Sequence, residues 1–350
     1  MDRKDRTANF MMTAPAVSVV VPCFNEERYI EQCVESILAS EYPRDRLEVI
    51  VVDGMSTDGT RAILKRMIVR YPNLRLVDNP DRIKPKALNL GIAAAEGDFL
   101  IRMDAHARYD CKYVARSVRY ALEFQASNVG GIRKTLPGED TLIARAIAQS
   151  ISSSFAAGNA TYRTGASEPK WVDTVFGGCY RMSLFDEIGY FDEDLIRGQD
   201  REFNIRLKRS GGNILLAPDI VCEYYSRGTL GAFVKWIYVA GLTPFYVSRI
   251  IGSAIFSWRN FVPMAFVLTI VALLVLTLLN TIFALALGLV LCVYILAALA
   301  AAFQISRAAR DFRLMFAMPF VFAVTHVVYG VGSLVGLVKP VRRSTSRSTS

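Results

Sequence analysis

Short apolar runs alternate with longer amphipathic stretches along the first third of the chain. The amphipathic stretches, for example 61–69 and 86–95, read as helices. The apolar runs are rich in valine, isoleucine and leucine, which is typical of strands buried on both faces. These runs lie at 17–21, 48–52, 74–77 and 99–103. This alternation of strand and helix predicts an α/β domain built on a parallel sheet.

The last third of the chain follows a different pattern, because apolar residues are nearly continuous there. No Asp, Glu, Lys, Arg or His occurs within 260–306. At about 1.5 Å per residue, one helix of that length would be roughly twice as long as the bilayer core is thick. Two transmembrane passes are therefore predicted, near 261–280 and 282–303. A third apolar run, 314–338, is long enough to favour a third pass, with a re-entrant segment as the alternative.

The segment 229–259 mixes tryptophan, tyrosine and phenylalanine with lysine and arginine, a composition typical of helices lying at a membrane surface. The stretch 156–170 is rich in Gly, Ser, Thr and Ala and reads as a mobile loop near a substrate site. The predicted parts are a flexible N-terminus (1–16), an α/β domain (17–228), interfacial amphipathic helices (229–259), a transmembrane region (260–338) and a basic tail (339–350).

The charge distribution predicts how the membrane region is oriented. The chain carries a net charge of +9, and eight basic residues but one acidic residue follow residue 250, so +7 of this charge lies at the membrane end. Basic loops stay in the cytoplasm, which predicts a multi-pass protein of the cell inner membrane with a cytoplasmic α/β domain. No footprint of nucleic-acid binding occurs. The six cysteines form no C-x-x-C pair and no cleavable signal is evident, so free thiols in a reducing compartment are expected.

The stretch 97–106, G-D-F-L-I-R-M-D-A-H, ends a predicted buried strand in an acidic and histidine-bearing tip. The carboxyl ends of parallel strands meet the crevice where α/β proteins bind ligands. Side chains two residues apart in an extended segment point the same way, so Asp104 and His106 are predicted to share a divalent cation or a diphosphate–metal complex. The alternative is that Asp104 caps the next turn and His106 is an ordinary surface histidine.

The turn after the first strand separates two classes of α/β protein. A dinucleotide-binding oxidoreductase should carry G-x-G-x-x-G there, whereas this chain reads P-C-F-N-E-E, without a glycine. The dehydrogenase interpretation therefore loses most of its support. A carboxylate pair in this turn suits recognition of a base, a sugar or a metal.

Four ordered segments carry a family resemblance: V-S-V-V-V-P-C-F-N-E-E, V-I-V-V-D-G-M-S-T-D-G-T, K-A-L-N-L-G and D-A-H. Together they resemble the nucleotide-binding half of family 2 glycosyltransferases with the GT-A fold, especially the exopolysaccharide type of succinoglycan assembly. The resemblance covers 17–227 and, more loosely, the membrane tail. It implies a Rossmann-like nucleotide-diphospho-sugar transferase domain, followed by interfacial helices and C-terminal transmembrane helices.

The resemblance also implies roles for single residues. The implied nucleotide-sugar contacts are Phe24, Asn25 and Glu26 near the nucleotide, Asp53 at the base edge (expected to be uracil), Lys86 at the ribose or diphosphate with Arg82 and Lys84 close by, and Asp104 at the sugar diphosphate and its metal. Asp53 could instead only shape a turn, and Lys86 could be a solvated helix residue. The family's usual tip is acid-x-acid, whereas His106 stands second here, so the choice between Mn²⁺ and Mg²⁺ stays open.

The segment R-G-Q-D-R-E contains the second acid of interest, Asp200. By the resemblance, a carboxylate preceded by Gln or Glu at this place is the general base that takes the proton of the acceptor hydroxyl. The alternatives are a helix-capping role for Asp200 and catalysis by Glu202. Gly177 and Gly178 are implied to lie under the donor sugar and the acceptor, since glycine permits close approach of the backbone.

The acceptor side is harder to read. Processive relatives carry Q-x-x-R-W where this chain reads A-F-V-K-W, so single-sugar transfer is predicted. Trp236, the last residue of that motif, either borders the acceptor or anchors the segment at the membrane interface.

These features predict an inverting glycosyltransferase that moves a sugar, glucose or a close relative, from a UDP-sugar to a lipid-linked saccharide in exopolysaccharide or cell-surface glycan synthesis. A divalent cation, Mn²⁺ or Mg²⁺, is the predicted cofactor, and other polysaccharide-assembly proteins are candidate partners. Two alternatives stay open: direct transfer to polyprenyl phosphate, and a non-catalytic scaffold that binds a nucleotide sugar in a polysaccharide assembly complex.

Overall fold

The computed structural model describes residues 14–157, 160–195, 197–252 and 257–340. Within them the chain forms two compact units. The first unit comprises residues up to Lys134 and Gly165–Tyr224, and the second comprises Thr135–Thr164 and the chain from Tyr225 onward. Most of the predicted flexible N-terminus and nearly all of the basic tail lie outside the described residues.

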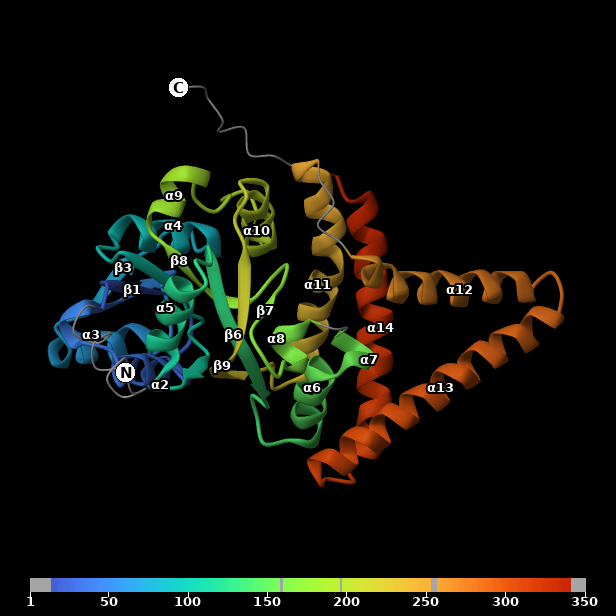
Figure 1. The fold of residues 1–350 in the computed structure, drawn as a ribbon. Helices are drawn as coiled ribbons and strands as arrows, with labels where there is room; N and C mark the ends of the chain where they lie inside the picture. The colour runs from blue at the N-terminus through green and yellow to red at the C-terminus, as the bar shows by residue number, and fades with distance from the viewer. Residues whose placement is uncertain (1–13, 158–159, 196, 253–256, 341–350) are drawn as a thin grey trace. The chain divides into compact units, whose positions relative to one another are not determined.

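The first unit is organised around a mixed sheet of order β3-β2-β1-β4-β8-β6-β9-β5 (Figure 1). The strands that pair in parallel are β1 (Val17–Cys23), β2 (Leu47–Asp53), β3 (Leu74–Asp78) and β4 (Phe99–Arg102). The others are β5 (Ala107–Tyr109), β6 (Asn128–Leu136), β7 (Lys170–Trp171), β8 (Phe176–Arg181) and β9 (Ile214–Tyr225). Antiparallel pairing begins between β4 and β8. The predicted parallel sheet is therefore correct only for its first four strands.

Helices of the first unit follow the predicted alternation. They are α2 (Ile30–Leu38), α3 (Thr60–Arg70), α4 (Lys84–Ala94), α5 (Tyr113–Glu123), α9 (Ser183–Ile188) and α10 (Gln199–Arg209). The core includes alternate valines of β1 and β2 together with the buried stripe of α2. The fold is thus α/β, with the loops after β1 to β4 at one edge of the parallel strands.

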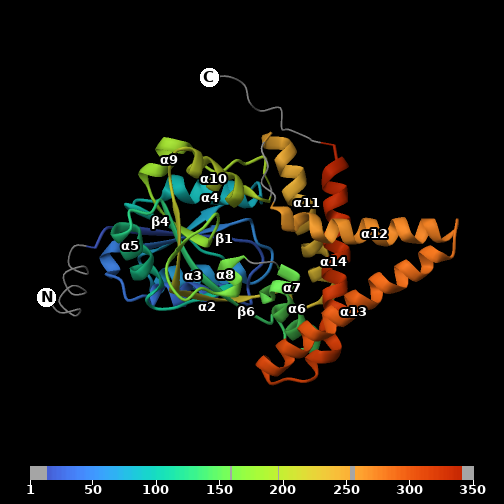
Figure 2. The same cartoon turned by 45° about the vertical axis from the view of Figure 1, so that its right-hand side comes forward.

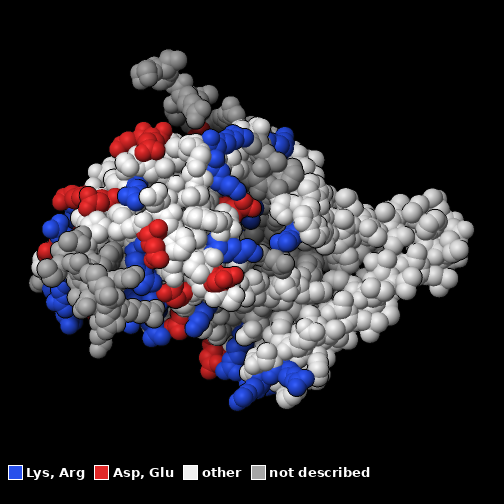
Figure 3. Space-filling model, viewed as in Figure 1, with Lys and Arg blue, Asp and Glu red and all other residues white. Residues whose placement is uncertain are grey.

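The second unit is helical (Figure 2). It contains α6 (Leu142–Ser152), α7 (Ser154–Ala157), α8 (Thr161–Thr164), α11 (Leu230–Ile251), α12 (Phe261–Thr277), α13 (Ile282–Ala309) and α14 (Leu314–Val338). Among the described residues, four helices are long and apolar enough to cross a membrane: 230–251, 258–277, 282–309 and 314–338. The surface of α12 and α13 is almost free of charged side chains (Figure 3). This composition supports association with a membrane.

The division of the chain differs from the prediction at one place. Residues 135–164, predicted to belong to the α/β domain, belong to the helical unit. The apolar stripe of α6 is the reason, because Ala146, Ile147 and Ile151 share a buried cluster with side chains of α11 and α14. A second difference is that 230–251 forms one continuous helix where several interfacial helices were predicted.

Helices α11 and α14 contact each other through their backbones. A Cβ atom placed on Gly332 would lie 2.2 Å from the Tyr238 carbonyl oxygen, and one on Gly241 would lie 2.2 Å from the Tyr329 carbonyl oxygen. Ser333 Oγ donates a hydrogen bond of 3.2 Å to the Gly241 carbonyl oxygen. Small residues at such contacts let helices approach closely where lipid removes the hydrophobic driving force between them.

We expect Gly332→Leu to destabilise the helical unit by about 1–3 kcal/mol, because its side chain would overlap the α11 backbone. Thermal unfolding of the purified protein in detergent measures this loss. Gly288→Leu is the matched control, since a Cβ atom on Gly288 of α13 would meet nothing within 4 Å. Equal losses in both variants would contradict the predicted packing.

Candidate active site

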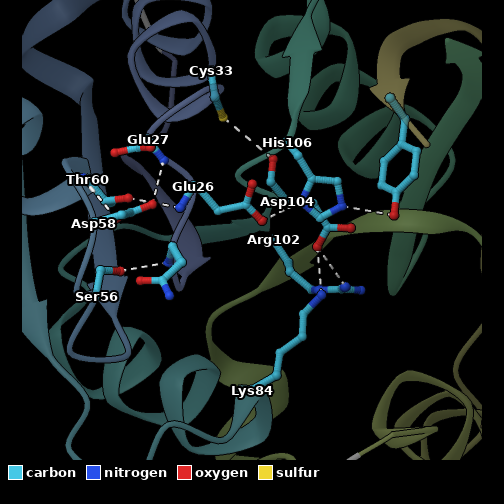
Figure 4. A network of polar contacts seen from close by, with 12 residues as sticks. Glu26, Glu27, Cys33, Ser56, Asp58, Thr60, Lys84, Arg102, Asp104 and His106 are labelled. Atoms are coloured by element: carbon cyan, nitrogen blue, oxygen red, sulfur yellow. Dashed lines mark hydrogen bonds and ion pairs between the residues drawn. The ribbon is translucent and has the colours of Figure 1, made fainter. Parts of the chain in front are cut away.

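The turns after β1 and β2 are joined by hydrogen bonds (Figure 4). The Asn25 backbone N–H donates to Ser56 Oγ at 2.8 Å, and the Thr57 backbone N–H donates to Asn25 Oδ1 at 2.8 Å. Asn25 has φ of 53°, a left-handed conformation that asparagine tolerates better than most residues. Glu26 is held in the same way, because its backbone N–H donates to Thr60 Oγ1 at 2.8 Å. The predicted nucleotide-binding turn is therefore rigidly attached to the next one.

Asp53 lies beneath these turns and has no exposed side-chain surface. Its Oδ2 accepts from the Ser56 backbone N–H at 3.0 Å and from Arg61 Nη1 at 2.6 Å, and its Oδ1 accepts from Ser56 Oγ at 2.5 Å. Arg61 also reaches Asp78 Oδ1 at 2.8 Å. With both oxygens engaged, Asp53 shapes the turn after β2, and its predicted contact with the base edge stays a prediction.

An aromatic ring and two polar groups lie beside this turn. The ring of Phe24 is 45% exposed, and the guanidinium carbon of Arg82 lies 5.9 Å from its centroid. A Cβ atom on Gly54 would lie only 3.3 Å from the Phe24 ring. Asn79 is buried at the end of β3, and its Oδ1 has no hydrogen-bond partner within the described residues. These groups suit a flat, polar ligand, and the sequence analysis did not identify Asn79.

Asp104 is buried just after the end of β4, and one of its carboxylate oxygens pairs with two basic side chains. Its Oδ1 lies 2.7 Å from Lys84 Nζ and 3.1 Å from Arg102 Nη2. Burial alone would raise the pKa of the Asp104 carboxyl, but the charges of Lys84 and Arg102 outweigh it and hold this pKa well below its usual range. Asp104 is therefore ionised at neutral pH.

The loop that carries Asp104 is also fixed through its backbone. The Asp104 N–H donates to Tyr109 Oη at 2.7 Å, and Cys33 Sγ donates to the Asp104 carbonyl oxygen at 3.5 Å. Such contacts from the surrounding core are what a preorganised site requires.

His106 is engaged at both ring nitrogens (Figure 4). Nδ1 lies 2.8 Å from Glu26 Oε1, and Nε2 lies 2.9 Å from Tyr224 Oη. Burial opposes protonation of the ring, but Tyr224 and the Glu26 carboxylate outweigh it and raise the pKa of His106 to about 9. A protonated imidazole with two partners has no lone pair for a metal.

Asp104 and His106 are each engaged by other side chains: Asp104 by Lys84 and Arg102, His106 by Glu26 and Tyr224. The rule that residues two apart point the same way applies to extended segments, whereas β4 ends at Arg102 and the chain turns at Ala105 and His106. The described residues contain no group of three or more His, Cys, Asp or Glu side chains that could hold a metal ion. Direct metal binding by His106 stays a prediction that this geometry does not favour.

Asp200 is the second residue of α10 and does not cap it. The N-cap position is Gly198, with φ of 86°, and no side chain makes a capping hydrogen bond there. Arg102 Nη1 lies 2.8 Å from Asp200 Oδ2, while Asp200 Oδ1 is buried and has no hydrogen-bond partner within the described residues. Glu202, the fallback candidate, is paired with Arg206 at 2.6 Å. The geometry thus favours Asp200 over Glu202 as a free acceptor of protons.

The lysine that reaches the acidic tip is Lys84. The predicted ligand contact, Lys86, instead lies 3.2 Å from Glu193 Oε2. Glu193 also accepts from Asn89 Nδ2 at 2.8 Å, so this group ties α4 to the segment before α10. Lys84 was noted in the sequence only as a neighbour, because the side-chain direction at the start of α4 cannot be read from spacing.

The predicted acceptor-side residues divide between the two units. Gly177 and Gly178 lie in β8, and a Cβ atom on Gly177 would lie 3.1 Å from the Arg102 carbonyl oxygen. Both have positive φ, 76° and 127°, which side chains rarely allow. They therefore lie beside the end of β4. Trp236 belongs to the helical unit, where its ring stacks on Phe233, and its role at the acceptor stays a prediction.

Comparison with known proteins assigns part of this chain to a family. The family model described as Glycosyl transferase family 2 matches residues 18–189. These residues form a family 2 glycosyltransferase domain. The structure is also similar to the mannosyltransferase PcManGT of Pyrobaculum calidifontis, solved with GDP-Man and Mn²⁺, with a TM-score of 0.58, 23% identity, and coverage of 93% of this chain and 87% of that one. This likeness shows the GT-A fold.

Two curated relatives are similar in sequence. A dolichyl N-acetyl-alpha-D-glucosaminyl phosphate 3-beta-D-2,3-diacetamido-2,3-dideoxy-beta-D-glucuronosyltransferase of Methanococcus voltae is 28% identical over 331 residues, which are 92% of this chain and 97% of the relative. The succinoglycan biosynthesis protein ExoA of Rhizobium meliloti (strain 1021) is 34% identical over 221 residues. The second match spans 63% of this chain and 66% of the relative.

We expect Arg61→Met to lower the free energy of unfolding of the α/β unit by about 2–3 kcal/mol, because it leaves the buried Asp53 carboxylate without its cation. Chemical denaturation followed by tryptophan fluorescence measures the change. Arg66→Met on the same helix removes an exposed arginine and should change stability by less than about 0.5 kcal/mol. A loss no larger than that control's would show that the ion pair does not support the turn.

Proposed function

We propose that the protein is an inverting glycosyltransferase that moves a sugar, glucose or a close relative, from a UDP-sugar to a lipid-linked saccharide. The observation that carries this proposal is the Asp200 carboxylate: one oxygen is held by Arg102, and the other is buried with no partner in the described part of the chain. A buried acceptor without a donor is costly, and it suits a site that receives a substrate hydroxyl.

The chemistry follows from the separate surroundings of the two acids. Asp200 takes the proton of the acceptor hydroxyl as its oxygen forms a bond to the anomeric carbon. The bond from that carbon to the diphosphate breaks at the same time, and the nucleoside diphosphate leaves on the opposite side. The configuration therefore inverts, so an α-linked donor gives a β-linked product. Lys84, beside Asp104, lies where its charge offsets that of the departing diphosphate.

The residues at Asp104 fit a divalent cation of a particular kind. Asp104 Oδ1 is taken by Lys84 and Arg102, whereas Oδ2 has no partner in the described part of the chain. One open carboxylate oxygen suits Mn²⁺ or Mg²⁺ bound mainly through substrate phosphates rather than in an all-protein cage. When bound, such a cation neutralises charge on the leaving diphosphate. We assign Asp104, and not His106, to hold it.

Two observations support a lipid-linked acceptor at a membrane. The described residues include four helices that can cross a membrane by length and composition. The name of the Methanococcus voltae relative specifies a dolichyl-phosphate-linked sugar. Arg307 in the last turn of α13, together with Arg310 and Arg313 before α14, favours a cytoplasmic position for that connection, and hence for the catalytic unit, on the inner membrane. Other polysaccharide-assembly proteins are candidate partners, as the name of ExoA suggests.

We expect Asp200→Asn to lower acceptor-dependent release of nucleoside diphosphate by about 10²–10⁴-fold, because the acceptor hydroxyl loses its base. The assay uses purified protein in detergent with Mn²⁺ or Mg²⁺, a panel of UDP- and GDP-sugars and a lipid-linked acceptor extract. Asp186→Asn, which changes an exposed acid of α9, is the matched control and should keep full activity.

Each outcome of this assay separates one alternative. Transfer of the sugar to a phosphate-terminated lipid would show that the acceptor is polyprenyl phosphate and not a lipid-linked saccharide. Donor binding without turnover, in an extract that supports a related enzyme, would favour the scaffold. Full activity of Asp200→Asn would remove Asp200 from the role of base.

We expect Lys84→Met to raise the KM for the donor about tenfold or more, because the diphosphate loses a nearby cation. Lys86→Met should have a smaller effect, since Lys86 is already paired with Glu193. Initial rates across donor concentrations measure both. Lys65→Met, an exposed lysine of α3, serves as the control. A larger effect at Lys86 than at Lys84 would return the diphosphate contact to the residue predicted from the sequence.

A further inference from the structure

Arg102 is the last residue of β4 and is the point where the two proposed catalytic acids meet. Its side chain is 6% exposed. Nη2 lies 3.1 Å from Asp104 Oδ1, and Nη1 lies 2.8 Å from Asp200 Oδ2. One guanidinium thus joins the end of β4 to the start of α10, two elements almost 100 residues apart in the chain.

This arrangement costs free energy, which indicates a functional role. A buried guanidinium loses its hydration, and two carboxylates close together repel each other. Arg102 Nε is also buried with no hydrogen-bond partner within the described residues. Although burial opposes the charged form, the charges of Asp200 and Asp104 outweigh it and keep the pKa of Arg102 above its ordinary value. The guanidinium therefore pairs with both acids through its two terminal nitrogens, while its third nitrogen, Nε, is left without a partner in the described residues.

The two acids depend on Arg102 to different degrees. Asp104 Oδ1 also has Lys84 at 2.7 Å, so it keeps a cation without Arg102. Asp200 has no other hydrogen-bond or ion-pair partner among the described residues. Its side chain is 35% exposed, so without Arg102 it is free to turn toward solvent. Loss of the guanidinium would accordingly displace the acceptor-side acid more than the donor-side acid.

We propose that Arg102 is a positioning residue that sets Asp200 on the acceptor side at a fixed distance from Asp104 on the donor side. This inference rests on the proposed transferase function. The planar fork suits the task, because it engages two separate carboxylates in fixed directions, whereas the ammonium of a lysine is a single point charge. Arg102 leaves Asp200 Oδ1 open, so the oxygen that receives the proton is the one that Arg102 does not occupy.

The test uses Arg102→Met, Asp200→Asn and the double variant in the full-length protein in detergent. Arg102→Met should lower kcat by about 100-fold, the scale expected when a reacting group is misplaced by about 1 Å. The donor KM should change by less than about threefold, because Lys84 remains at Asp104. The double variant should be no more than about threefold slower than Asp200→Asn alone, since Arg102 acts through Asp200.

The matched control is Arg108→Met, which removes an exposed arginine paired with Glu223 at 2.7 Å and should leave kcat unchanged. Arg102→Lys keeps the charge without the fork and should recover part of the lost kcat. If Arg102→Met does not fold, Arg102→Lys carries the test, with an expected loss of kcat of about tenfold at an unchanged donor KM.

Three results would overturn the inference: multiplied losses in the double variant, a loss confined to the donor KM, or an unchanged kcat in Arg102→Met. A wild-type protein without acceptor-dependent transfer would instead refute the proposed function. A double-mutant cycle of thermal unfolding on the wild type, the two single variants and the double variant then still tests whether Arg102 is coupled to Asp200. Arg102→Met should cost less stability in the Asp200→Asn background than in the wild type, and equal costs would show that the two residues are not coupled.

Discussion

Four parallel strands that end at one edge of the sheet are the constraint on which the site depends. Because β1, β2, β3 and β4 run in register, the residues that follow them are forced to the same side of the domain. The first turn bonds to the second through Asn25 and Ser56, and the end of β3 bonds to that of β2 through the Asn79 backbone. This edge is thus held together by backbone hydrogen bonds and short polar side chains.

The edge is also where the sheet changes from parallel to antiparallel pairing. Strand β8 pairs with β4, and Gly177 allows its backbone to approach Arg102 closely. This change in direction lets a distant part of the chain, α10 with Asp200, reach the end of β4. Acids from both halves of the unit therefore meet across one buried arginine, which joins the proposed donor side to the proposed acceptor side.

Much of the fold could be read from local patterns. The alternation of buried strands and helices and the charge-free stretch 260–306 depend on residues close in sequence, and the strands and the long apolar helices that they predict are present in the described residues. The membership of α6 could not be read in this way. Its apolar stripe specifies that it is buried but not against what, and the structure packs it on α11 and α14.

In the candidate site, too, features that depend on nearby residues could be predicted, whereas contacts between distant residues could not. Local motifs were enough to select Asp104 and Asp200 as candidates, because the position of an acid after a buried strand or at the start of a helix is a local property. The partners of these acids were not predictable: Arg102 lies among apolar residues of β4, Lys84 replaced Lys86 at the tip, and His106 is occupied by Glu26 and Tyr224. Which charges meet is decided by contacts between residues about 20 to 120 positions apart, and only the folded chain brings them together.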